Sequence, residues 1–145
     1  MKPTPERGFP DDEYAARCAA LQAAMAREAV DAVLFASEAE IRYFTGFMTP
    51  FWQSPTRPWY VLLPLTGKPV AVIPSIGGPL MRSCHVDDVL TWSAPAESDD
   101  GVSLLASTIR QHAAPGQRLG LLMGRETALR MPAADMMALR TMLPD

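Results

Sequence analysis

The sequence contains few of the residues from which catalytic and metal-binding sites are built. Only two histidines and two cysteines occur among its 145 residues, whereas a metal centre needs several such ligands, or carboxylates, that converge on one point. Cys84 and His85 are neighbours that could form a nucleophile pair, but adjacency is their only support, and we expect His85 to lie at a surface turn. No Gly-x-Ser-x-Gly elbow, P-loop or dinucleotide-binding glycine pattern is present. We therefore expect neither a catalytic residue nor a bound metal or cofactor within this chain.

Other absences argue against whole classes of partner. The net charge of -3 and the lack of any run of lysine and arginine argue against a nucleic-acid surface. No apolar stretch approaches the roughly 20 residues of a membrane-spanning helix, and the first residues lack the apolar core of a secretory signal. We therefore expect a cytoplasmic protein with two free thiols that binds neither nucleic acid nor membrane.

Apolar runs and helical periodicity alternate along the chain, which predicts an α/β domain. Continuous apolar runs are typical of strands buried on both faces, and two of them are joined by a glycine turn, as in an antiparallel hairpin. We expect residues 1–11 to be a flexible lead-in and residues 12–145 to form one domain, with a mixed sheet of about five to six strands flanked by helices. The predicted helices are 12–28, 38–44, 76–84, 101–113 and one that begins at Pro132, and the predicted strands are 32–36, 60–64, 69–74, 89–92 and 118–123.

Polar residues at three predicted helix starts match known capping signals. A side-chain oxygen at such a position accepts hydrogen bonds from the free N–H groups of the first turn. The candidates are Ser37 with Glu40 in a capping-box pattern, Asp11 or Asp12 before the first helix, and Asp99 or Asp100 before the helix over 101–113.

Aromatic residues are concentrated in one segment, residues 43–60, which holds seven of the eleven. Most of this segment connects a predicted helix to a predicted strand. Connections are usually polar and exposed, whereas aromatic residues and arginine are enriched where proteins bind partners. One interpretation is a hydrophobic flap packed on the domain's own sheet, with Arg57 in solvent. For Arg57 with Trp52 and Trp59 we favour a contact outside the domain, because a guanidinium grips carboxylates and an indole stacks on cations or proline rings.

Four short segments carry a resemblance to a known family: 31–37, 41–47, 57–64 and 67–74. In residues and in order they resemble the N-terminal domain of the creatinase, prolidase and aminopeptidase P family. The most specific single segment is Ile-Arg-Tyr-Phe-Thr-Gly-Phe at 41–47, and a weaker match follows at 118–121. The resemblance covers about residues 12–145.

The resemblance implies a mixed sheet flanked by helices that precedes a separate pita-bread catalytic domain. In peptidase members that catalytic domain binds two divalent metal ions such as Mn, Co or Zn, whereas creatinase works without metal. Its motifs do not occur in this chain, which ends about where the catalytic domain of the family would begin. The resemblance therefore implies a non-catalytic part of a larger hydrolase.

The resemblance also implies a role for the aromatic segment. Family members are commonly homodimers, in which a loop of the N-terminal domain reaches the active site of the other subunit. There an aromatic residue and an arginine help to hold the substrate in creatinase-like members. Because residues 51–59 match that loop best, Arg57, Trp52 and Trp59 are predicted to contact substrate in the partner subunit.

Three hypotheses about function stay open at this point. The first is the N-terminal domain of a metal-dependent Xaa-Pro dipeptidase or aminopeptidase P-like enzyme, whose partners are its own catalytic domain, a second subunit and a small-molecule or proline-containing peptide substrate. The second is the same domain of a metal-free, creatinase-like amidinohydrolase. The third is a free-standing small α/β ligand-binding module.

Overall fold

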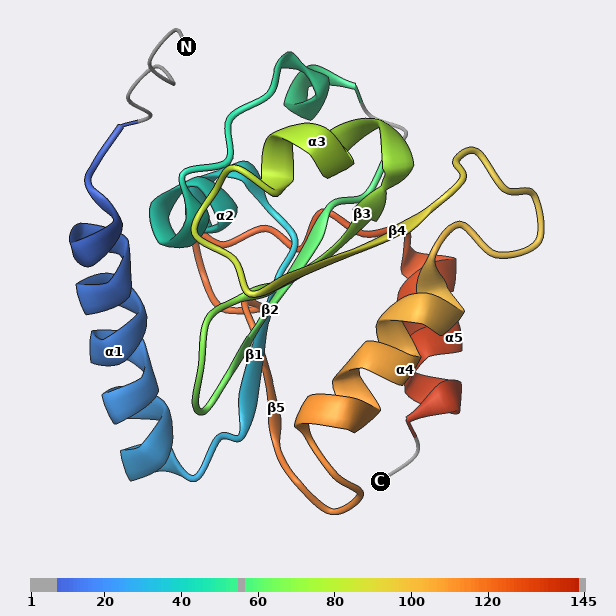
Figure 1. Cartoon of the computed structure of the whole chain (residues 1–145). Helices are drawn as coiled ribbons and strands as arrows, with labels where there is room; N and C mark the ends of the chain where they lie inside the picture. The colour runs from blue at the N-terminus through green and yellow to red at the C-terminus, as the bar shows by residue number, and fades with distance from the viewer. Residues whose placement is uncertain (1–7, 55–56, 144–145) are drawn as a thin grey trace, which may run out of the picture.

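A computed structural model describes residues 8–54 and 57–143 of the chain (Figure 1). At its centre lies a five-stranded sheet in the order β4-β3-β2-β1-β5. The strands are β1 (Ala32–Phe35), β2 (Tyr60–Pro64), β3 (Val70–Pro74), β4 (Asp88–Trp92) and β5 (Leu119–Leu121). The helices are α1 (Asp11–Glu28), α2 (Glu38–Thr45), α3 (Gly78–Met81), α4 (Val102–His112) and α5 (Ala133–Met142), with short 3-10 helices η1 (Pro50–Gln53) and η2 (Ser75–Gly77).

The sheet is mixed, as the sequence predicts. β2 and β3 form the predicted antiparallel hairpin, and β2 also pairs antiparallel with β1. β1 pairs parallel with β5, and β3 pairs parallel with β4. All residues of β1, β2 and β3 are buried, which is why these strands appear in the sequence as unbroken apolar runs.

Helices cover both faces of the sheet and create two apolar cores (Figure 1). Alternate strand residues point to opposite faces, so Val33 and Phe35 join the core under α1 and α2, whereas Ala32 and Leu34 join the core under α4 and α5. None of the helices in the described ranges is both long and apolar enough to cross a membrane.

Two capping predictions are wrong in detail. Pro10 precedes α1, so Asp11 lies inside the first turn, and no capping hydrogen bond comes from the residue that precedes the helix. The Ser37 hydroxyl bonds the carboxylate of Glu40 and does not cap α2, so the box is incomplete. In the third case Gly101 directly precedes α4, and it is Asp99, two residues earlier, whose carboxylate accepts hydrogen bonds from the N–H of Val102 at 2.7 Å and of Ser103 at 3.1 Å.

Candidate functional site

The aromatic loop, described in its residues 46–54 and 57–59, begins where α2 ends. Gly46 has φ +76°, a left-handed conformation that glycine adopts without strain and that ends the helix. The Thr45 side chain accepts a hydrogen bond from the N–H of Phe47 at 3.1 Å, and the Thr49 side chain accepts one from the N–H of Phe51 at 3.3 Å. Local hydrogen bonds therefore shape the first half of the loop, which lies at the same end of the sheet as α3 (Figure 1).

Both tryptophans of the loop pack inside the domain. Trp59 has no exposed surface and Trp52 is 8% exposed, with their ring centroids 6.0 Å apart. The backbone of Gly77 lies so close to Trp59 that an added Cβ atom would be 2.3 Å from its ring. The substrate contact predicted for Trp52 and Trp59 stays a prediction, but the loop would have to open before either indole could make it.

Side chains other than the two tryptophans form the exposed surface of the loop. Phe51 is 41% exposed and stacks on Trp59 with ring centroids 6.3 Å apart, and Met48 is 55% exposed. Arg57 is half-buried. Sequence reasoning did not single out Phe51, because spacing alone does not tell which aromatic of a cluster faces outward.

Arg130, in the segment between β5 and α5, is a second residue that sequence reasoning missed. Its guanidinium donates hydrogen bonds to the backbone carbonyls of Ser54 and Arg57 and lies 5.4 Å from the centroid of a Trp52 ring. Burial lowers the pKa of Arg130. The contacted residues are 73 and 76 positions away in the sequence, a separation at which no local pattern signals a contact.

Three buried polar groups at or beside the loop have no hydrogen-bond partner within the described ranges. They are the indole N–H groups of Trp52 and Trp59 and the hydroxyl of Tyr60. Such orphan groups are uncommon in native proteins. Burial also raises the pKa of Tyr60 well above its ordinary value, so this hydroxyl stays protonated at neutral pH.

The described residues contain no group of three or more histidine, cysteine, aspartate or glutamate side chains placed to hold a metal ion. What the aromatic loop can offer chemically is recognition: a guanidinium for an anionic group and an exposed ring for an apolar one.

A family model described as the Creatinase/Prolidase N-terminal domain matches residues 17–145. The chain belongs to this family. The resemblance predicted from segments 31–37, 41–47, 57–64 and 67–74, with the weaker match at 118–121, is thus confirmed. No curated protein sequence matches the chain.

Solved structures with the same fold include creatinase/prolidase N-terminal domains and longer enzymes. A prolidase from Thermococcus sibiricus has 20% identity and a TM-score of 0.73, and the dipeptidase PepE from Mycobacterium ulcerans has 22% and 0.65; each match covers 94% of this chain and 34% of the other. The Creatinase/Prolidase N-terminal domain of an X-Pro dipeptidase from Streptococcus pyogenes has 13% identity and a TM-score of 0.67, with 89% and 88% covered. The chain thus spans about a third of the length of the two longer enzymes.

In this creatinase/prolidase N-terminal domain the prediction that His85 lies at a surface turn is wrong. His85 is only 4% exposed, and its ring stacks on Tyr14 with centroids 6.1 Å apart. Its Nδ1 atom pairs with the Asp11 carboxylate, whereas the Cys84 thiol donates to the carbonyl of Leu80. These two hydrogen bonds join Cys84 and His85 to different partners and not to each other.

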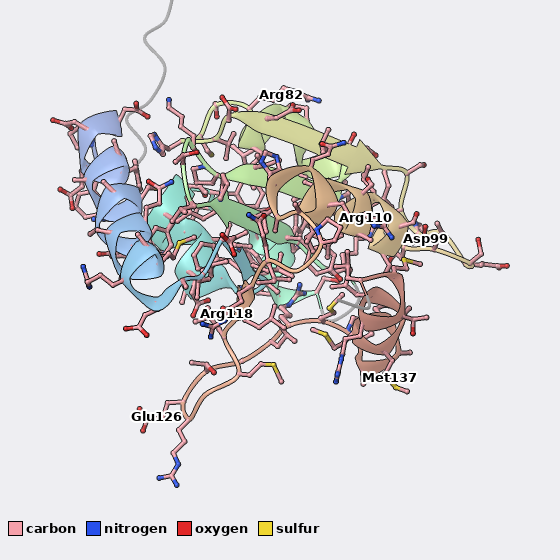
Figure 2. The ribbon with its side chains drawn as sticks, turned by 90° about the horizontal axis from the view of Figure 1, so that it is seen from below. Arg82, Asp99, Arg110, Arg118, Glu126 and Met137 are labelled. Atoms are coloured by element: carbon pink, nitrogen blue, oxygen red, sulfur yellow. The ribbon has the colours of Figure 1, made fainter. Side chains whose placement is uncertain are left out.

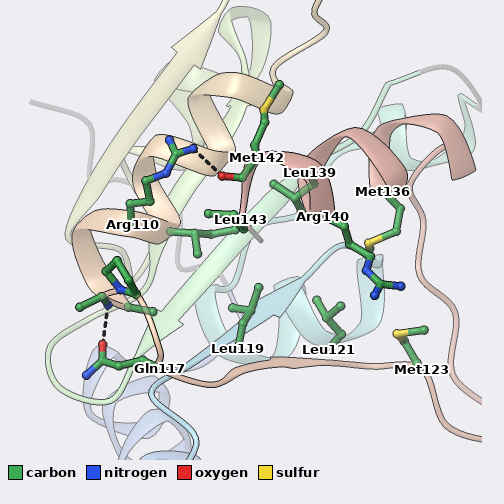
Figure 3. Close-up of a pocket in the computed structure, with 14 residues that line it drawn as sticks. Arg110, Gln117, Leu119, Leu121, Met123, Met136, Leu139, Arg140, Met142 and Leu143 are labelled. Carbon is green, nitrogen blue, oxygen red and sulfur yellow. Dashed lines mark hydrogen bonds between the residues drawn. The ribbon is translucent and has the colours of Figure 1, made fainter. Parts of the chain in front are cut away.

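The domain also has an apolar groove between α4, α5 and β5, with a volume of about 500 Å³ (Figure 3). Leu119 and Leu121 rise from the edge strand on one side, and Leu139 and Leu143 face them from the other. The loop that follows β5 extends away from the domain, with Glu126 at its tip (Figure 2). The side chains that line the groove are mostly apolar, and the polar ones are Arg110, Gln117 and Arg140.

Proposed function

We propose that this domain is the non-catalytic part of a prolidase-like hydrolase, in which it supports dimerisation and closes the substrate pocket of the partner subunit. The observation that carries the proposal is the makeup of the aromatic loop. It combines half-buried Arg57 with exposed Phe51, whose ring stacks on the buried ring of Trp59.

The two side chains suit a proline-containing peptide. The Arg57 guanidinium would bind a carboxylate in a bidentate fashion, and the Phe51 ring would pack against an apolar residue such as proline. Similar folds occur in proteins described as Xaa-Pro dipeptidases, which supports this substrate class. Two divalent metal ions would be held by the catalytic domain of the parent enzyme and not by this one.

Other surfaces are consistent with a part of a larger assembly. The apolar groove at β5 offers a surface for the enzyme's own catalytic domain or a second subunit. Both cysteines are free thiols, and we propose a cytoplasmic location on that ground, because thiols persist in reducing compartments.

The proposal is tested first by the reading frame beyond codon 145. A catalytic domain encoded in frame supports it, and a native stop codon there would favour the free-standing binding module. In an enzyme with both domains, activity that persists after complete removal of metal would point to a creatinase-like amidinohydrolase instead.

The role of the loop is tested by Arg57→Ala in that two-domain enzyme. We expect kcat/KM to fall by a factor that corresponds to about 2–4 kcal/mol of lost transition-state stabilisation, because a charged contact at a subunit interface is lost. The melting temperature should stay unchanged. Arg27→Ala is the matched control, because Arg27 is an exposed arginine in the last turn of α1. Equal kinetics for the Arg57 variant and the control would rule out the proposed contact.

A further inference from the structure

Arg130 is anchored from both sides on the body of the domain. Its neighbours Leu129 and Met131 pack against the core under α4 and α5, and the N–H of Met131 donates to the carbonyl of Leu129 at 2.9 Å. Pro132 then precedes the first turn of α5. The backbone that bears Arg130 is therefore held by packing and does not depend on the aromatic loop.

From this anchor the side chain reaches across to the aromatic loop. Two guanidinium nitrogens bond two different carbonyls, those of Ser54 and Arg57, and the same guanidinium lies over Trp52. The loop is thus held where η1 ends and again at the residue proposed to contact substrate. Two separated acceptors need donors on separate atoms in a rigid fork, which arginine has and lysine lacks.

The charge of Arg130 is not neutralised by an ion pair with any carboxylate in the described ranges. Its polar contacts there are the two loop carbonyls, although its side chain is half-buried. Hydrogen bonds from a charged donor are stronger than neutral ones, and a half-buried charge that loses its acceptors is penalised. The guanidinium therefore favours one placement of the loop backbone.

We propose that Arg130 is a positioning residue that fixes the aromatic loop, and with it Arg57, in the geometry needed at the partner's substrate pocket. Only the last step of this inference, the placement of Arg57 at the partner's substrate pocket, rests on the proposed function. The hydrogen bonds from Arg130 to the loop lie within this chain, so their effect can be measured without any catalytic domain.

The first test uses the chain itself with Arg130→Gln and Arg130→Lys. Hydrogen exchange is followed at the amides of Trp52 and Ser54, which donate to the carbonyls of Thr49 and Phe51 at the two ends of η1. We expect both variants to exchange at least about tenfold faster at these amides, as the loss of a charged hydrogen bond implies, while amides of β1 and β2 keep their rates. Arg125→Gln is the matched control, because Arg125 lies exposed in the same segment. Unchanged exchange at Trp52 and Ser54 in both Arg130 variants would overturn the inference.

The second test measures kinetics in the two-domain enzyme. We expect Arg130→Gln and Arg130→Lys to lower kcat/KM in the same direction as Arg57→Ala, and Arg130→Gln to add little once Arg57 is absent, because both act through one contact. If Arg57→Ala lowers kcat/KM and both Arg130 variants match wild type, the positioning role is wrong while the proposed function survives. If Arg57→Ala leaves kcat/KM unchanged, the proposed function is wrong, and so is the idea that Arg130 positions Arg57 for substrate. Faster amide exchange in the Arg130 variants would then show only that Arg130 holds the loop.

Discussion

The ring nitrogen Nδ1 of His85 lies 2.5 Å from the carboxylate oxygen Oδ1 of Asp11. This contact joins the turn after α3 to the first turn of α1. The His85 side chain is 2% exposed and that of Asp11 is 70% exposed, so the pair spans the boundary between core and solvent. Lys68, from the turn between β2 and β3, approaches the other carboxylate oxygen at 3.7 Å. The Asp11 carboxylate in α1 thus contacts side chains from two other parts of the chain.

This pair makes the stability of the domain depend on Asp11 in a definite pH range. The hydrogen bond with His85 is the main cause that lowers the pKa of Asp11. A carboxyl group with a lowered pKa in the folded state stabilises the fold above its ordinary pKa of about 3.9 and loses that contribution as the pH falls through the lowered value. We expect Asp11→Asn to reduce the free energy of unfolding at pH 7 by less than about 1 kcal/mol, because the carboxylate is largely exposed.

The measurement is urea unfolding of wild type and Asp11→Asn between pH 7 and pH 3. The difference in the free energy of unfolding between the two proteins should become smaller as the pH falls below about 4. Asp12→Asn is the control, since the Asp12 carboxylate is exposed and accepts only from the N–H of Glu13 in the described structure. A constant difference across this pH range would contradict the assignment.

A second prediction concerns the contact between Gly77 and Trp59. A methyl group at Gly77 would lie 2.3 Å from one ring atom of Trp59 and 2.9 Å from another, and Trp59 is fully buried. Overpacking of this kind costs about 1–3 kcal/mol, so Gly77→Ala should lower the melting temperature by at least about 3 °C. Gly124→Ala should leave it unchanged, because nothing lies within 4 Å of the added atom. Equal melting temperatures for the two variants would show that Trp59 does not pack there.

A third prediction distinguishes the two cysteines by their reactivity. Burial raises the pKa of the Cys18 thiol to about 11, and Cys18 is 3% exposed, so almost none of it is the reactive thiolate at pH 8. Iodoacetamide should therefore label Cys84, which is half-buried, well before Cys18 in the native protein. In urea both should react, and peptide mass spectrometry reports the site. Native labelling of Cys18 at the rate of Cys84 would mean that α1 leaves the sheet readily.

The parts of the fold that the sequence predicts are those in which a local pattern decides the structure. The segments 32–36, 60–64 and 69–74 are strands because apolar residues on both faces leave a buried strand as the favourable arrangement. The glycine turn between the last two also makes their antiparallel pairing predictable. By contrast, the predicted helix over 76–84 shortens to η2 and the four residues of α3.

The candidate site depends on contacts between residues far apart in the sequence, which no local pattern encodes. Trp52 and Trp59 stand out in the sequence by type, but their burial results from packing against the rest of the core. His85 and Asp11 are 74 positions apart, and Arg130 lies 73 positions from Arg57. Composition locates the aromatic loop, whereas only the fold determines which of its side chains face outward.

The last prediction concerns Asp99 at the start of α4. Its carboxylate accepts hydrogen bonds from the N–H groups of Val102 and Ser103, which the first turn of the helix otherwise leaves unpaired. Asp99→Ala should lower the free energy of unfolding by about 1 kcal/mol at pH 7, and Asp99→Asn should lower it far less, because asparagine also caps helices. The side-chain hydrogen bond with Ser103 is the main cause that lowers the pKa of Asp99, so the deficit of Asp99→Ala should diminish as the pH falls below about 4. Urea unfolding measures all three proteins, and an equal loss in the Ala and Asn variants would mean that the charge of Asp99, and not its cap, stabilises α4.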